Sequence, residues 1–173
     1  GVQTCALPIY DVLIIPEYST IRSRKDVSIS TFMNGISLDV PIISSNMDTI
    51  TESQMANAMD MLGAGACLHR FSTINENKLM YKNSPKKTMV SIGVGAEEFD
   101  RAMALFESGA QTFVIDVAHG AAEHVVRQYD NLRAVVKENA AIIVGNFATG
   151  ISIKDFNQDR KSTRLNSSHS SVS

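Results

Sequence analysis

Polar or glycine-rich clusters follow apolar runs at five places along the chain. They are Ser44–Thr49, His69–Arg70, Gly93–Gly95, Asp116–Gly120 and Gly145–Asn146. Enzymes built from parallel strands place binding and catalytic groups on the loops at the carboxyl ends of those strands. The repetition of the pattern is more informative than any single cluster, and it predicts one composite site to which all five loops contribute.

Asp116 carries the sharpest chemical signal of these residues. It ends the apolar run Phe113–Ile115, where a buried carboxylate without a partner would be costly. One interpretation is that Asp116 caps the helix that follows. The other is that it accepts a hydrogen bond from a ribose hydroxyl or pairs with a cation such as Arg70, because only one strand separates the two residues.

Three further signals are less specific. Gly93-x-Gly95 lacks the third glycine of a dinucleotide-binding fingerprint, so it fits a plain tight turn as well as a close approach of the backbone to a ligand. We interpret His119 as a helix-entry residue with a local hydrogen bond. Cys67 lies in mid-strand among apolar neighbours and is interpreted as a buried packing residue rather than a nucleophile.

A basic cluster precedes the first of these motifs, at Arg22, Arg24 and Lys25. A solvated charged loop is one interpretation of it. The other is phosphate recognition, because clustered Arg and Lys bind phosphate through charge-assisted hydrogen bonds.

The elements that must position these residues alternate between apolar runs and amphipathic stretches. Strands are expected at Pro41–Asn46, Ala66–His69, Thr88–Val94, Thr112–Ala118 and Ala141–Phe147. Helices are expected to begin at a Thr49-x-x-Glu52 capping box, near Asn75–Tyr81, around a stripe from Phe99 to Phe106, from Val125 to Val136, and again near Ile151. This alternation predicts an α/β fold with a parallel sheet, although periodicity alone does not choose between a doubly wound sheet and a barrel.

Composition sets the broad class of the protein. The 173 residues carry a formal charge of −2 and are 44% hydrophobic, which predicts a soluble globular protein with no nucleic-acid partner. No apolar run reaches the roughly 18 residues of a membrane span. Two cysteines provide no disulfide framework and favour a cytoplasmic location. A complete (β/α)₈ barrel usually takes about 250 residues, so only part of one is expected here.

Both ends of the sequence look foreign to the rest. One set of codons for Gly1–Ile9 has a reverse complement that encodes Asp-Arg-Lys-Ser-Thr-Arg-Leu-Asn-Ser, which is Asp159–Ser167. We therefore expect residues 1–9 and 159–173 to derive from translated adapter DNA, and the native segment to be residues 10–158. The alternative is a flexible N-terminal arm with a disordered basic tail.

Five motifs together resemble the IMP dehydrogenase/GMP reductase family. They are Tyr10–Pro16, Pro41–Thr49, His69–Phe71, Ile115–Gly120 and Val144–Gly150, in the order and spacing of that family. The resemblance implies that residues 10–158 are the N-terminal half of a (β/α)₈ TIM-barrel catalytic domain. An incomplete barrel is then expected, with its first five strands and about four helices.

Two features are more similar to the reductases than to the dehydrogenases. Most IMP dehydrogenases carry a regulatory tandem between the second helix and the third strand, but only about 18 residues separate Arg70 from Met89. Ser19–Asp26 also looks like the loop that, in the reductases, reaches the NADPH of a neighbouring subunit. An NAD-dependent IMP dehydrogenase without the insert remains the alternative.

The resemblance implies the reaction and its residues. GMP and NADPH would give IMP, ammonia and NADP⁺ through attack of a cysteine on purine C2. Substrate contacts would come from Ser45, Asn46 and Met47, auxiliary catalysis from Arg70 and Asp116, and cofactor contacts from Arg24, Lys25, Asp116, Val117, Ala118 and Asn146.

Other family features are expected outside these residues. The catalytic cysteine and a monovalent-cation loop would follow the fifth strand, and the parent protein would be a homotetramer. No metal site is expected in this chain. The competing hypothesis is an inert fragment whose first and fifth strands are unpaired edges that invite aggregation.

Overall fold

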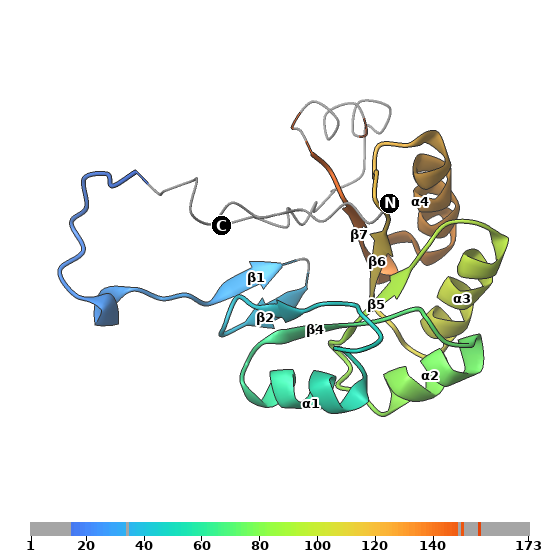
Figure 1. The fold of residues 1–173 in the computed structure, drawn as a ribbon, viewed down its shortest axis with the longest axis horizontal. Helices are drawn as coiled ribbons and strands as arrows, with labels where there is room; N and C mark the ends of the chain where they lie inside the picture. Colours follow the sequence, from blue (N-terminus) through green and yellow to red (C-terminus); the bar gives the residue numbers. More distant parts are fainter. Residues whose placement is uncertain (1–14, 34, 149, 151–155, 157–173) are drawn as a thin grey trace.

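The computed structural model describes residues 15–33, 35–148, 150 and 156 (Figure 1). The two segments expected to be foreign, residues 1–9 and 159–173, lie outside this part, as does most of the helix expected near Ile151. The main feature is a five-stranded parallel sheet whose strands are hydrogen-bonded in sequence order. The strands are β3 (Ile43–Ser44), β4 (Gly65–Leu68), β5 (Met89–Ile92), β6 (Thr112–Asp116) and β7 (Ala141–Gly145).

A helix connects each strand of this sheet to the next. The helices are α1 (Ser53–Met61), α2 (Ile74–Lys82), α3 (Ala96–Glu107) and α4 (Glu123–Val136), with short 3₁₀ turns η1 (Arg24–Asp26) and η2 (Lys137–Asn139). Figure 1 shows α1 to α4 following one another along one side of the sheet. A doubly wound sheet reverses its strand order and has helices on both faces. The unbroken order with helices on one side is that of half a barrel, which confirms the expected fold class.

Alternation along the strands separates an outer from an inner face. On β6, Phe113 and Ile115 are fully buried within the cluster that includes the helices, whereas Val114 belongs to a different cluster on the inner face. On β7, Ile142 and Ile143 divide in the same way. Because a strand has a period of two and both faces are covered, each strand of the sequence is a nearly continuous apolar run.

An antiparallel hairpin that the sequence analysis did not predict covers part of the inner face. It consists of β1 (Thr31–Met33) and β2 (Ile36–Leu38). Ile36 and Leu38 are almost fully buried and pack with Cys67, Met89 and Ile143. The hairpin therefore supplies apolar contacts to a face that would otherwise be open.

Helix ends differ from the sequence predictions in one place. The predicted capping box at Thr49 and Glu52 is wrong, because α1 begins at Ser53 and Glu52 is its N-cap residue without a side-chain cap bond. The Glu52 carboxylate lies instead 3.6 Å from His69 Nε2. Gly109 follows α3 with a φ of 101°, a left-handed conformation that suits glycine at this position.

No helix in the described part of the chain is long and apolar enough to cross a membrane.

Candidate functional site

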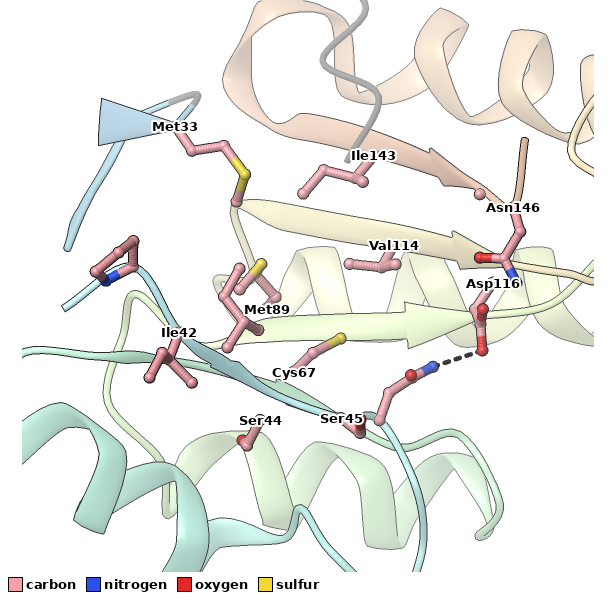
Figure 2. A pocket seen from close by; sticks show the side chains of 14 residues that line it. Met33, Ile42, Ser44, Ser45, Cys67, Met89, Val114, Asp116, Ile143 and Asn146 are labelled. Carbon is pink, nitrogen blue, oxygen red and sulfur yellow. Dashed lines mark hydrogen bonds between the residues drawn. The ribbon is translucent and has the colours of Figure 1, made fainter. Parts of the chain in front are cut away.

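The inner face of the half-barrel lines a cavity of about 460 Å³ that is open to solvent. Its walls are apolar and include Cys67, Met89, Val114 and Ile143, one residue from each of β4 to β7 (Figure 2). Asn46, Asp116 and Asn146 line the same cavity where β3, β6 and β7 end. Polar side chains therefore lie at the carboxyl ends of the strands, and apolar side chains line the rest of the cavity.

A hydrogen bond between the loop after β3 and the end of β6 shows how strongly the sheet curves. Asn46 Nδ2 donates to Asp116 Oδ2 over 2.8 Å, and the dashed line in Figure 2 marks this bond. Asn46 follows β3, whereas Asp116 ends β6, so β4 and β5 lie between them. In a flat sheet these strands would be roughly 14 Å apart, given about 4.8 Å per strand. The sheet must therefore bend around the cavity, as a barrel wall does.

The loops after β6 and β7 are held together by backbone hydrogen bonds. Val117 N donates to Gly145 O over 3.0 Å, and Asn146 N donates to Val117 O over 2.7 Å. Gly120 N donates to Asn146 O over 2.8 Å. A Cβ on Gly120 would lie 3.0 Å from the Phe147 ring, closer than ordinary van der Waals contact, so a larger residue would displace that ring. These contacts fix Asn146 beside Asp116 at the cavity mouth (Figure 2).

Of the described residues that line the cavity, Asp116 alone is charged. Its environment excludes the first of the two sequence interpretations. The N-cap residue of α4 is Ala122, so Asp116 does not cap that helix. No ion pair joins Asp116 to Arg70 within the described ranges, so that alternative is not observed there, and the Asn46 amide is the hydrogen-bond partner of Asp116.

Cys67 is the only cysteine of the described chain, and it is buried. Burial raises the pKa of its thiol far above the ordinary value, and the negative charge of Asp116 raises it further. A thiol of this kind holds very little thiolate, which is the nucleophilic form. The interpretation of Cys67 as a buried packing residue is confirmed.

Arg70 lies against the loop after β5, not among the residues that line the cavity. A Cβ on Gly93 would be 3.2 Å from the Arg70 guanidinium carbon, which itself lies 4.8 Å from the centre of the Phe71 ring. Arg70 is half-buried, and its Nε has no hydrogen-bond partner in the described structure. His119 is exposed in the loop before α4, where its carbonyl accepts a hydrogen bond from Ala122 N, as expected of a helix-entry residue.

The remaining predicted site residues are brought together only in part. Ser45 lines the cavity, and Met47 follows it on the same loop with about half of its surface exposed. Val117 is half-buried against the outer core, whereas Ala118 is exposed.

Arg24 and Lys25 lie apart from this group. They are exposed on η1, where Ser23 and Asp26 form a capping box. Residues 15–30 extend away from the sheet (Figure 1), and neither basic residue lines the cavity.

Sequence reasoning missed the apolar side chains of the cavity. Met33 of the hairpin and the inward-facing Met89, Val114 and Ile143 were not singled out, although they line it. The alternation of faces along each strand could have identified the last three.

Comparison with known proteins places this geometry in a family. Residues 6–160 match the family model described as the IMP dehydrogenase / GMP reductase domain. The chain belongs to the IMP dehydrogenase/GMP reductase family. The family resemblance inferred from the five motifs is thereby confirmed.

Similar proteins in this family carry both names. The chain is 35% identical over 151 residues to a GMP reductase of Klebsiella pneumoniae, covering 81% of this chain and 43% of the relative. It is 30% identical over 155 residues to human GMP reductase 1, covering 84% and 45%. It is 28% identical over 190 residues to an inosine-5'-monophosphate dehydrogenase of Cryptosporidium parvum, covering 84% and 47%.

A solved structure is similar over nearly the whole chain. The inosine 5'-monophosphate dehydrogenase of Legionella pneumophila matches with a TM-score of 0.78 and 39% sequence identity, covering 90% of this chain and 48% of that one. The chain therefore spans about half the length of the relatives that it matches.

Proposed function

We propose that this chain is the N-terminal half of the barrel of an NADPH-dependent GMP reductase. The reaction is GMP + NADPH + 2 H⁺ giving IMP + NH₄⁺ + NADP⁺, in which hydride replaces the amino group on purine C2. The full protein would act as a cytoplasmic homotetramer that uses a monovalent cation. Its nucleophilic cysteine would lie outside the residues described here.

The observation that carries this proposal is the compact connection between β4 and β5. Within the family, most dehydrogenases carry a regulatory tandem at this point. Here α2 ends at Lys82, β5 begins at Met89, and a short turn joins them. Tyr81 Oη donates to Lys86 O over 3.1 Å and ties the end of the helix to that turn. The similarity to reductases of Klebsiella pneumoniae and human supports the same choice.

A second candidate is an IMP dehydrogenase without the regulatory insert, which oxidises IMP to XMP with NAD⁺. The 39% identity to the Legionella pneumophila dehydrogenase favours it. The basic residues of η1 favour the reductase. Arg24 and Lys25 suit the additional phosphate of NADPH, which NAD⁺ lacks.

The residues at the cavity mouth fit the nicotinamide and ribose parts of such a cofactor. Asp116 offers carboxylate oxygens to ribose hydroxyls, and Asn146 offers an amide donor and an amide acceptor. Among the described residues that line the cavity there is neither Lys nor Arg. The phosphates would therefore be bound elsewhere, one of them by Arg24 and Lys25 of a neighbouring subunit. The cofactor supplies the hydride when bound.

The other site residues have separate roles in this proposal. Ser45, Asn46 and Met47 contact the purine nucleotide, and Val117 and Ala118 line the nicotinamide-ribose side with Asp116. Arg70 supports the hydride step electrostatically from the loop after β4. We do not assign a covalent role to Cys67, because its raised thiol pKa leaves almost no thiolate.

Steady-state assays of the 173-residue chain and of the full-length protein that contains it test the proposal. The chain alone should oxidise no NADPH with GMP, because Cys67 does not form the covalent C2 adduct. The full-length protein should oxidise NADPH when GMP is added. NAD⁺ reduction with IMP and no response to GMP would assign the protein to the dehydrogenases. Turnover by the 173-residue chain would contradict the assignment of the nucleophile.

A further inference from the structure

A buried polar network lies outside the cavity, between α2, α3 and the loops after β4 and β5. At its centre is Arg101, whose side chain is only 4% exposed. Arg101 Nη1 donates to Asn77 Oδ1 over 2.5 Å and to Ser72 O over 2.9 Å, and its Nε donates to Glu98 Oε1 over 3.1 Å. A buried guanidinium is tolerated because paired acceptors replace its water.

This network continues to the two loops that flank Arg70. Asn77 Nδ2 donates to His69 O over 2.8 Å, so the network binds the residue before Arg70, while Ser72 is held two residues after it. On the other side, Glu98 Oε2 accepts a hydrogen bond from Gly93 N over 2.5 Å. Gly93 is the residue against which the Arg70 guanidinium rests. Arg101 therefore joins the backbone of the Arg70 loop to the surface on which Arg70 lies.

Among the described residues, few other contacts hold the Arg70 side chain. Its guanidinium stacks over Phe71 at 4.8 Å, and its Nε is buried without a hydrogen-bond partner among the described residues. Its position thus depends on where the two loops stand relative to each other.

We propose that Arg101, acting through Glu98 and Asn77, is a positioning residue that sets the Arg70 guanidinium at the strand ends. This inference rests on the proposed function only for the role of Arg70 in the hydride step. Replacement of a buried ion pair by apolar residues of similar volume is often neutral for stability. The observation that supports a positioning role is that the network bonds to both loops beside Arg70.

Nuclear magnetic resonance of the 173-residue chain tests the positioning directly. With its guanidinium 4.8 Å from the centre of the Phe71 ring, Arg70 should have ring-shifted side-chain resonances, and these report whether the guanidinium stays over the ring. Arg101→Met keeps much of the volume but removes the donors. Asn77→Asp is nearly isosteric but replaces the donor to His69 O with an oxygen. Both variants should lose the ring shift of Arg70. Amide exchange at Gly93 should also become at least about tenfold faster in Arg101→Met, since Glu98 is no longer held.

Arg133→Met is the matched control. Arg133 also donates from a half-buried position to backbone carbonyls, those of Lys137 and Ala140, but at the far end of α4. It should lower the melting temperature while leaving the Arg70 resonances unchanged. If Arg133→Met moves those resonances as much as the network variants do, the effect is global and the proposal is wrong. If Arg101→Met does not fold, the Arg70 resonances of Asn77→Asp alone decide whether the proposal holds.

Unchanged Arg70 resonances in folded Arg101→Met and Asn77→Asp would overturn the proposal. In the full-length protein, Arg101→Met should lower kcat severalfold while changing the KM for NADPH little, and Arg101→Lys should not restore kcat because lysine lacks the planar fork. The resonance experiment requires no turnover. If the full-length protein does not reduce GMP, the result on the position of Arg70 still holds. If the Arg70 resonances do not move in the variants, the proposed reaction is unaffected.

Discussion

The hydrogen bond between Asn46 and Asp116 predicts an energetic coupling between residues on distant strands. Hydrogen bonds to charged groups contribute about 1.5–3 kcal/mol, and both side chains are only half-buried, so we expect a value near the lower end. Asn46→Ala, Asp116→Ala and the double variant form a double-mutant cycle. The coupling in the free energy of unfolding should be about 1–1.5 kcal/mol, measured by urea denaturation of the 173-residue chain.

A control cycle with Asn57 in place of Asn46 gives the coupling energy expected when the two side chains do not touch. Asn57 is also an asparagine, but its Nδ2 donates to Ser53 O and Asn83 O, within α1 and at the end of α2. The cycle of Asn57→Ala with Asp116→Ala should give less than about 0.5 kcal/mol. If the Asn46 cycle gives a value as small as this control, the loops after β3 and β6 do not meet, and the curvature inferred from their contact is wrong.

Two further predictions concern a thiol and a basic turn. Burial raises the pKa of Cys67, so the neutral thiol favours the folded state, and this stability is lost as the pH rises above the ordinary value of 9.0. Above pH 9.0, the free energy of unfolding should fall by about 1.4 kcal/mol per pH unit relative to that of Cys67→Ala. Urea titrations at several pH values measure this difference. An equal pH dependence in both proteins would contradict the prediction. In the full-length protein, replacing Arg24 and Lys25 with Ala should raise the KM for NADPH more than that for GMP in steady-state kinetics, and an equal rise in both would remove their cofactor role.

The sequence predicted the sheet and helices because their signals are local. Alternating apolar runs and helical stripes placed β4 to β7 and α2 to α4 near their observed positions. The β1–β2 hairpin was missed, although Asn34-Gly35 between two short apolar segments is a strong hairpin signal. The capping box at Thr49 and Glu52 was wrong because the spacing of those residues fits the motif while the helix starts one residue after Glu52.

The site was predictable as a set of loops but not as a set of contacts. Every strand end singled out in the sequence lies at the same end of the parallel sheet. The partner of Asp116 was not predictable, because it depends on the curvature that brings the loop after β3 across two strands. Pairing of Arg70 with Asp116 was one alternative, yet Arg70 lies against Gly93, whose missing side chain leaves room for the guanidinium. Such close approaches have no periodic signature in the sequence.

Ammonia release tests the proposed function most directly. The full-length protein should release one ammonia per NADPH oxidised when GMP is supplied, and none when IMP and NAD⁺ are supplied. Reduction of NAD⁺ with IMP, without ammonia release from GMP and NADPH, would contradict the account and identify an IMP dehydrogenase without the regulatory insert.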